Sequence, residues 1–272
     1  MAEINGHDYK YYSDLIRGSE PSYINSNKNK RIHRELISKL RSKQIIQFYK
    51  SKANLDLENI KKGQETTWEK AVMLASFVAQ NVPHDNQKID LNKRNAISLW
   101  KYSRKVPTGF NCRWHSIMLS ELLLAVGIKN CFITCLPMDR NDGDCHVVNS
   151  VWLPETKSWA MIDSDMMEYA TDKSGKPISL KDMREYISAE HEFDLHALPG
   201  FENSWAGSDY MKCYWSKNLY WFARHTTYGF NLESGGIWND RYICLVPNDY
   251  HFDRNKFGGV ETNCDIEFWD LI

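Results

Sequence analysis

The spacing of hydrophobic residues divides the chain into segments of different predicted structure. Residues 1–27 show no period and are rich in glycine, serine and asparagine, so we expect an irregular arm there. Across residues 28–50, Ile32, Leu36 and Leu40 share one helical face among lysines and arginines, which predicts an amphipathic basic helix. Such a face can bind phosphate or anionic lipid, but a solvated surface is its commoner use, so we interpret this helix as structural.

Two shorter helices are expected next. Thr66 is followed three residues later by Glu69, which is a capping-box pattern, and the apolar spacing then predicts a helix that ends before Pro83. Residues 93–102 predict a second, short helix.

A long apolar segment begins at Cys112. Residues 117–126 are apolar nearly all round, and Gly127 follows where a helix often ends, which predicts a central, buried helix. Cys112 falls in its first turn, where unpaired backbone amides and the positive end of the helix dipole favour a thiolate. Cys112 is therefore a candidate nucleophile, although a buried cysteine is more often inert packing.

The period becomes strand-like after residue 128. Strands are predicted at 131–136, 145–153 and 158–162, with a polar loop at 138–144 and a turn at 154–157.

The register of this predicted hairpin decides which side chains meet. With its centre between Pro154 and Glu155, the hairpin pairs His146 with Asp163. Directly opposed residues have Cβ atoms roughly 4.5–5.5 Å apart, close enough for an imidazole–carboxylate hydrogen bond. A slip by one residue would place the two side chains on opposite faces of the sheet.

The rest of the chain is polar first and aromatic later. A short helix is expected at 180–189, and residues 201–272 contain five of the ten tryptophans, two or three predicted strands and a turn at 234–236. These rings could line a groove for a sugar or peptide, but packing on the core is their commoner use.

Composition and charge exclude several classes of function. The 272 residues carry a formal net charge of -1, so nothing pulls the whole protein toward nucleic acid or an anionic membrane. No segment approaches the roughly 18 consecutive apolar residues that a membrane-spanning helix needs. The sequence contains no glycine-rich phosphate loop and no dinucleotide-binding motif, so we expect no cofactor. The polar first residues contain no signal peptide, although an exported chain with its signal removed would look the same.

The cysteine count bears on the compartment and on metal binding. Seven scattered cysteines make a poor disulfide framework, which favours a reducing, cytoplasmic compartment. Cys131, Cys135, Cys145 and His146 invite a zinc interpretation, but they lack the Cys-x-x-Cys spacing of structural zinc sites, so we expect no metal.

Four motifs in order carry a resemblance to a known family. They are Gly109-Phe110-Asn111-Cys112, Ala125-Val126-Gly127-Ile128, His146-Val147-Val148-Asn149 and Trp159-Ala160-Met161-Ile162-Asp163. With the helix that precedes them, residues 66–169 resemble the transglutaminase-like (transglutaminase core) superfamily of papain-like folds. The resemblance implies an α+β fold in which helices pack on a small antiparallel sheet, with the nucleophile on the central helix.

The resemblance also implies a role for each residue of a triad. Cys112 is the nucleophile, His146 is its general base and later its acid, and Asp163 orients the imidazole. The same roles follow from the chemistry of a thiol beside a histidine and a carboxylate. The backbone amide of Cys112 would donate to the oxyanion, with a second donor from one of three upstream candidates: Gln80, Asn81 or His84.

The chain departs from the family pattern at three places. Ser164-Asp165 follows Asp163 where proline is common, which makes Asp165 a rival for the acid of the triad. Val147-Val148 replaces an aromatic-containing pair after the histidine, and His84 stands where tyrosine is common. These changes leave the triad intact and bear on substrate specificity.

The prediction is therefore an α+β protein with three parts. Residues 1–65 are an N-terminal arm and helical extension, 66–170 the catalytic core, and 171–272 an aromatic-rich region packed on that core as one compact unit. The predicted reaction is hydrolysis of an amide in a peptide, protein or glycopeptide through a thioester. Protein cross-linking, removal of a glycan from asparagine, and non-catalytic peptide or glycan binding are the alternatives.

Overall fold

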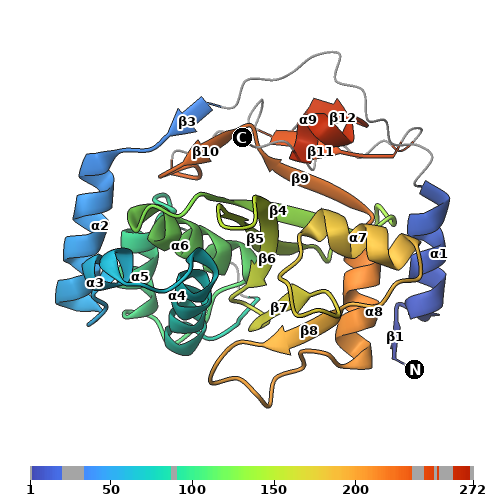
Figure 1. Cartoon of the computed structure of the whole chain (residues 1–272), viewed down its shortest axis with the longest axis horizontal. Helices are drawn as coiled ribbons and strands as arrows, with labels where there is room; N and C mark the ends of the chain where they lie inside the picture. Colours follow the sequence, from blue (N-terminus) through green and yellow to red (C-terminus); the bar gives the residue numbers. More distant parts are fainter. Residues whose placement is uncertain are drawn as a thin grey trace.

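The computed structural model describes residues 2–19, 34–86, 91–234, 242–247, 250 and 260–269 (Figure 1). The helices in these ranges are α1 (Tyr9–Ser19), α2 (Lys39–Lys52), α3 (Leu57–Lys62), α4 (Thr67–Asn81), α5 (Ala96–Ser103), α6 (Cys112–Ala125), α7 (Leu180–Ser188), α8 (Asp209–Asn218) and α9 (Asp265–Trp269). The strands are β1 (Glu3–Ile4), β2 (His7–Asp8), β3 (Arg34–Leu36), β4 (Asn130–Leu136), β5 (His146–Leu153), β6 (Ser158–Asp163), β7 (Glu168–Thr171), β8 (Asp194–Ala197), β9 (Trp221–His225), β10 (Thr227–Gly229), β11 (Tyr242–Leu245) and β12 (Val260–Thr262).

One large sheet runs through the molecule. Within the described ranges it has eight strands in the order β12-β11-β9-β4-β5-β6-β7-β8, antiparallel except for the β11–β12 pair. The mixed helix-and-sheet fold is as predicted, but the sheet is larger than the small sheet we expected. Two short pairs, β1–β2 and β10–β3, stand apart from it.

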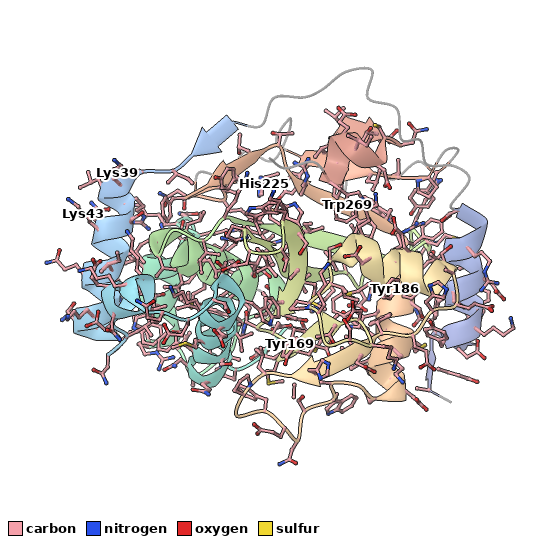
Figure 2. All side chains as sticks on the ribbon, in the orientation of Figure 1. Lys39, Lys43, Tyr169, Tyr186, His225 and Trp269 are labelled. Carbon is pink, nitrogen blue, oxygen red and sulfur yellow. The ribbon has the colours of Figure 1, made fainter. Side chains whose placement is uncertain are left out.

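Helices cover both faces of this sheet (Figure 1). Helices α2–α6 pack with Phe132 and Val147 in one core, and α1, α7 and α8 pack with Ile133 and Val148 in another. Neighbouring strand residues thus enter opposite cores, which is why β4 and β5 are apolar almost throughout. The side chains fill the space on both sides of the sheet (Figure 2).

The predicted helix around residues 66–82 and the predicted helix from Cys112 are confirmed. Thr66 and Glu69 form a capping box at the start of α4. Asn111 caps α6, and Gly127 follows its end with a φ of +90°, a conformation that glycine adopts without strain.

The predictions for the N-terminal segment were wrong in two respects. The expected irregular arm contains helix α1, which packs beside α8 and α7. The basic helix begins only at Lys39, with Ser38 as its cap, because residues 34–36 form a strand beside β10; residues 28–33 lie outside the described ranges. Lys39 and Lys43 point outward from α2 (Figure 2), and Leu40 is exposed too.

The predicted register of the β5–β6 hairpin was wrong by two residues. Leu153 is the last residue of β5 and pairs with Ser158, which leaves a four-residue turn centred between Glu155 and Thr156. The predicted centre lay one position earlier, beside Pro154. The turn needs all four residues because Lys157 adopts a left-handed conformation, with a φ of 52°, before β6 begins.

This correction changes how His146 and Asp163 meet. One step beyond the Asn149–Ile162 pair, Asp163 comes opposite Val148, so His146 is its diagonal neighbour. An offset of two residues keeps both side chains on the same face of the sheet, and diagonal neighbours are within reach of long side chains. The two residues therefore still make contact.

The C-terminal region contributes strands to the sheet of the core. Strand β9 lies between β4 and β11, as two or three strands were expected here, but α8 was not predicted. Trp215 and Trp221 are buried, whereas Trp205 is exposed. Trp238 and most of the predicted turn at 234–236 lie outside the described ranges. In the part of the chain that is described, no helix is long and apolar enough to cross a membrane.

Candidate active site

Cys112 is the first residue of α6. Asn111 caps the helix by accepting a hydrogen bond from the backbone N–H of Trp114 at 3.2 Å. Every residue from Trp114 to Ala125 is buried, whereas Cys112 is only half-buried. The helix is thus held rigidly, and its first turn presents the thiol at the edge of the core.

A close backbone contact fixes the loop before Cys112. The N–H of Phe110 donates to the carbonyl oxygen of Pro83 at 2.9 Å, and the N–H of Asp85 donates to the carbonyl oxygen of Phe110 at 2.8 Å. A Cβ atom on Gly109 would lie 2.1 Å from that Pro83 oxygen, so only glycine fits here. The contact brings His84 beside the segment that carries the nucleophile.

His146 and Asp163 form a buried hydrogen-bonded pair. Nε2 of His146 lies 2.5 Å from Oδ2 of Asp163, and both side chains are 1% exposed. Oδ1 of Asp163 accepts backbone N–H groups from Asp165 and Met166 at 2.8 and 3.1 Å. Burial alone would lower the pKa of His146, but the charge and hydrogen bond of Asp163 and the nearby Cys112 raise it well above its ordinary value.

Two aromatic rings from α8 enclose the imidazole. Tyr214 and Trp215 approach His146 edge-on, with ring centroids 5.5 and 5.4 Å from its own. Nε1 of Trp215 also donates to Oε1 of Glu168 at 2.6 Å. Because α8 was predicted as part of a strand region, the sequence did not point to these residues.

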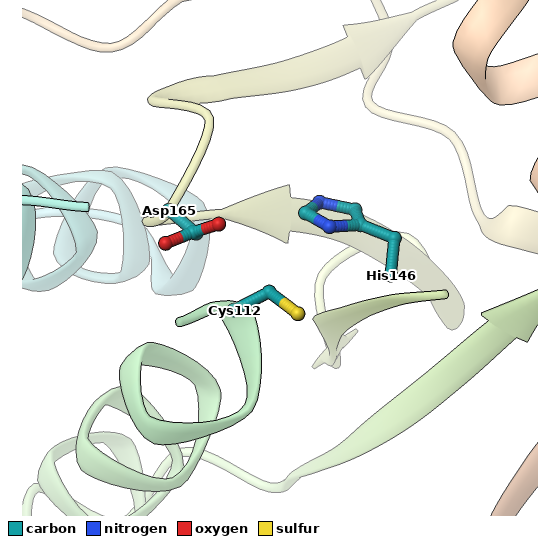
Figure 3. A group of neighbouring side chains, drawn as sticks. All are labelled: Cys112, His146 and Asp165. Atoms are coloured by element: carbon teal, nitrogen blue, oxygen red, sulfur yellow. The ribbon is translucent and has the colours of Figure 1, made fainter. Parts of the chain in front are cut away.

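The thiol, the imidazole and a carboxylate converge in Figure 3. Sγ of Cys112, a ring nitrogen of His146 and a carboxylate oxygen of Asp165 all lie within 4.8 Å of one another. Since Nε2 of His146 bonds to Asp163, Nδ1 is the ring nitrogen left for Cys112. Sγ of Cys112 also lies 3.9 Å from the carbonyl oxygen of Cys145.

Asp165, the rival acid, is hydrogen-bonded to a different histidine. Its two oxygens lie 2.9 and 3.0 Å from Nδ1 of His84, and Oδ1 lies 3.6 Å from Nε2 of the buried His115. Burial alone would raise the pKa of Asp165, but the His84 hydrogen bond lowers it below its ordinary value. The same hydrogen bond raises the pKa of His84. Two carboxylate–histidine pairs therefore lie beside Cys112.

The three oxyanion candidates are placed differently. Gln80 is exposed, and its amide lies against Gly200. The side-chain amide of Asn81 donates to the carbonyl oxygen of Phe77 within its own helix. His84 alone of the three is joined to the cluster around Cys112, and its side chain is 36% exposed.

Glu168 is a buried acid that sequence reasoning missed. It pairs with Asp163 across β6 and β7 and is fully buried. Burial, and to a lesser degree the charge of Asp163, raise its pKa to about 8, so it is neutral at pH 7. The segment from Ser164 to Thr171 shows no apolar–polar alternation, so no pattern in the sequence placed this acid inside the sheet.

The sequence of this region matches a known family. The sequence model of the transglutaminase-like superfamily matches residues 57–164. The matched segment runs from α3 to the end of β6, so it contains Cys112, His146 and Asp163 and ends one residue before Asp165.

Two solved structures similar to this chain are those of a candidate cysteine protease from Cytophaga hutchinsonii and of EGTA-treated LapG from Legionella pneumophila. The first is 16% identical, with a TM-score of 0.32, and the aligned part covers 47% of this chain and 39% of that protein. LapG is 15% identical, with a TM-score of 0.34, and the aligned part covers 67% of this chain and 97% of LapG. No curated protein matches the sequence.

Proposed function

We propose that this protein hydrolyses an amide bond through a thioester at Cys112. The observation that carries the proposal is the position of His146, which is hydrogen-bonded to Asp163 and has a ring nitrogen within 4.8 Å of Sγ of Cys112. A thiol, a histidine and an orienting carboxylate in this order are the parts of an active site with a cysteine nucleophile.

The first half of the reaction forms the thioester. The Cys112 thiolate attacks the carbonyl carbon, and the carbonyl oxygen takes the electron pair of the broken π bond. The carbon–nitrogen bond then breaks, and the His146 imidazolium gives its proton to the leaving amine. Asp163 stabilises the imidazolium and, by holding Nε2, keeps Nδ1 turned toward the thiol.

The second half returns the enzyme to its starting state. Neutral His146 takes a proton from water, and the resulting hydroxide attacks the thioester carbon. The carbon–sulfur bond breaks, which releases the carboxylic acid and restores the thiolate beside the imidazolium. Hydrolysis is favoured over cross-linking because cross-linking needs a second site that admits an amine and excludes water.

Two donors would stabilise the oxyanion in this scheme. One is the backbone N–H of Cys112, which has no partner within its helix because it lies in the first turn. The other is Nε2–H of His84: Nδ1 is held by Asp165, and no hydrogen-bond partner of Nε2 occurs among the described residues. A donor of this kind contributes about 3 kcal/mol to transition-state stabilisation.

The His84 assignment can be separated from thiol activation. We expect His84→Leu to slow acylation of Cys112 by p-nitrophenyl acetate by roughly 10²-fold. Alkylation by iodoacetamide forms no oxyanion, so it should change little, and His84→Gln should recover part of the acylation rate. An equal loss of both reactions would mean that His84 only holds the loop before Cys112.

The proposed reaction is tested with casein and a labelled primary amine. Wild-type protein should release new amino termini without incorporating the amine, and Cys112→Ala or His146→Ala should lower this rate by roughly 10²–10⁴-fold. Incorporation of the amine would indicate cross-linking instead. A glycopeptide in the same assay tests release of the glycan. If the thiol of Cys112 is unreactive and neither casein nor the glycopeptide is turned over, the protein is a binding module and not an enzyme.

A further inference from the structure

Asp165 has no role in the proposed triad, yet its carboxylate lies at the reacting atoms. A carboxylate oxygen of Asp165, Sγ of Cys112 and a ring nitrogen of His146 are mutually within 4.8 Å. Asp165 is 2% exposed, so its negative charge is held in the protein interior next to a thiol that is itself negative when reactive.

The three groups are also a set of ligands for a soft divalent metal. Thiolate, imidazole and carboxylate are the ligand types that zinc takes, and three protein ligands with one open position are typical of accessible zinc sites. Zinc–ligand bonds of about 2.0–2.3 Å place neighbouring ligand atoms roughly 3–4 Å apart. The groups around Cys112 would need to close by only about 1 Å to reach that spacing.

Hydrogen bonds from neighbouring residues orient two of the three ligands, as they do in known metal sites. Nε2 of His146 is held by Asp163, which leaves Nδ1 as the ligand nitrogen, and the carboxylate of Asp165 is held by Nδ1 of His84. Metal-binding histidines and carboxylates characteristically have such partners, which fix their orientation. Among the described residues this is the one group of His, Cys and acidic side chains with this spacing.

We propose that Cys112, His146 and Asp165 bind one zinc ion, which shuts off acyl transfer by taking the thiolate and the imidazole out of the reaction. Binding itself requires only the three ligands, whereas the inhibition rests on the proposed function. Zinc binding displaces the proton of the thiol.

Co²⁺ serves as the spectroscopic probe of the ligand set, and Zn²⁺ then competes with it. Metal-free full-length protein should bind one Co²⁺ per chain and show the visible bands of four-coordinate cobalt with a sulfur-to-cobalt charge-transfer band. Stoichiometric Zn²⁺ should abolish both. Cys112→Ser should lose the charge-transfer band, while Cys264→Ser, a change of a buried cysteine between β12 and α9, should retain it.

The role of Asp165 is measured by competition and by thiol protection. Asp165→Asn should weaken zinc binding by about 100-fold, and Asp163→Asn by about 10–100-fold through loss of orientation of His146. The ratio of the iodoacetamide alkylation rates of Cys112 with and without Zn²⁺ gives a second readout, normalised within each variant. It should show strong protection in the wild type and little in Asp165→Asn.

Several outcomes would overturn the site. The site is wrong if wild-type protein shows no charge-transfer band, or if the band persists in Cys112→Ser. It is also wrong if Zn²⁺ protects Cys112 equally in wild type and Asp165→Asn, or if Cys145→Ser loses cobalt binding while Cys112→Ser keeps it. If Zn²⁺ accelerates casein hydrolysis, the ion is catalytic and the inhibitory proposal is wrong. A metal-free protein with no acyl transfer that still binds zinc at these residues would contradict the proposed function but not the site.

Discussion

At the scale of single residues, the chemistry depends on which carboxylate each histidine meets. Asp163 holds His146, and Asp165 holds His84, although the two acids are only two positions apart in the sequence. The backbone N–H of Asp165 donates to Asp163, so the tight turn after β6 aims the two side chains at different partners. One short segment thus serves both the proposed triad and the proposed zinc site.

The neutral acid beside this pair gives a pH-dependent prediction. The pKa of Glu168 is raised from 4.5 to about 8, so the unfolded chain loses this proton at lower pH than the folded protein. Its contribution to stability is therefore fully present below about pH 4.5 and is lost as pH rises to about 8. For wild-type protein we expect the free energy of unfolding to fall by roughly 3 kcal/mol between pH 5 and pH 8 because of Glu168. Glu168→Gln cannot ionise at this position, so it should not show this fall.

Urea unfolding of both proteins at the two pH values measures the effect. Glu192→Gln, a change of an exposed carboxylate, is the control and should leave the pH dependence of wild type unchanged. Identical pH dependence in wild type and Glu168→Gln would show that Glu168 is ionised in the folded protein.

At the scale of elements, the sequence predicted what local patterns encode. Helices α4 and α6 follow from their caps and apolar spacing, and the order of β4, β5 and β6 follows from period and turns. The two-residue register error arose because apolar alternation is unchanged by an even shift, so only the exact turn distinguishes the two registers. Helix α8 was missed because its aromatic residues favour strands as well.

Other contacts at this scale could not have been predicted from one sequence. The pairing of His84 with Asp165 depends on residues 83–85 lying against the loop around Gly109, a tertiary contact with no local signal. The triad could be proposed because a family pattern orders its residues along the chain. The second carboxylate–histidine pair has no such pattern.

At the scale of the whole molecule, distant segments converge on the loop before His146. Nζ of Lys217, on α8, lies 2.8 Å from Asp142 and 3.0 Å from Asp144, and its side chain is 1% exposed. Asn5, near the N-terminus, donates to the same carboxylate of Asp142. This ion-pair group joins the N-terminal segment and α8 to the loop that leads into β5.

Removing the buried lysine should therefore loosen the whole arrangement. We expect Lys217→Met to lower the free energy of unfolding by about 1–3 kcal/mol, because Asp142 and Asp144 lose their charged hydrogen-bond partner while the Asp144 side chain stays half exposed. Lys10→Met breaks the exposed pair with Asp14 and should cost less than about 1 kcal/mol. Denaturant unfolding measures both, and equal effects would mean that Lys217 is not held as described.

The central claim is that His146 and Asp163 activate the thiol of Cys112. The most direct measurement is the rate at which iodoacetamide alkylates Cys112 at neutral pH, located by peptide mass spectrometry, in wild type, His146→Ala and the denatured protein. We predict that folded wild-type protein reacts at least about tenfold faster than the denatured chain, because a thiol activated by a base carries far more thiolate. His146→Ala should lose that advantage. A folded wild-type rate no faster than the denatured rate, and unchanged in His146→Ala, would contradict the account.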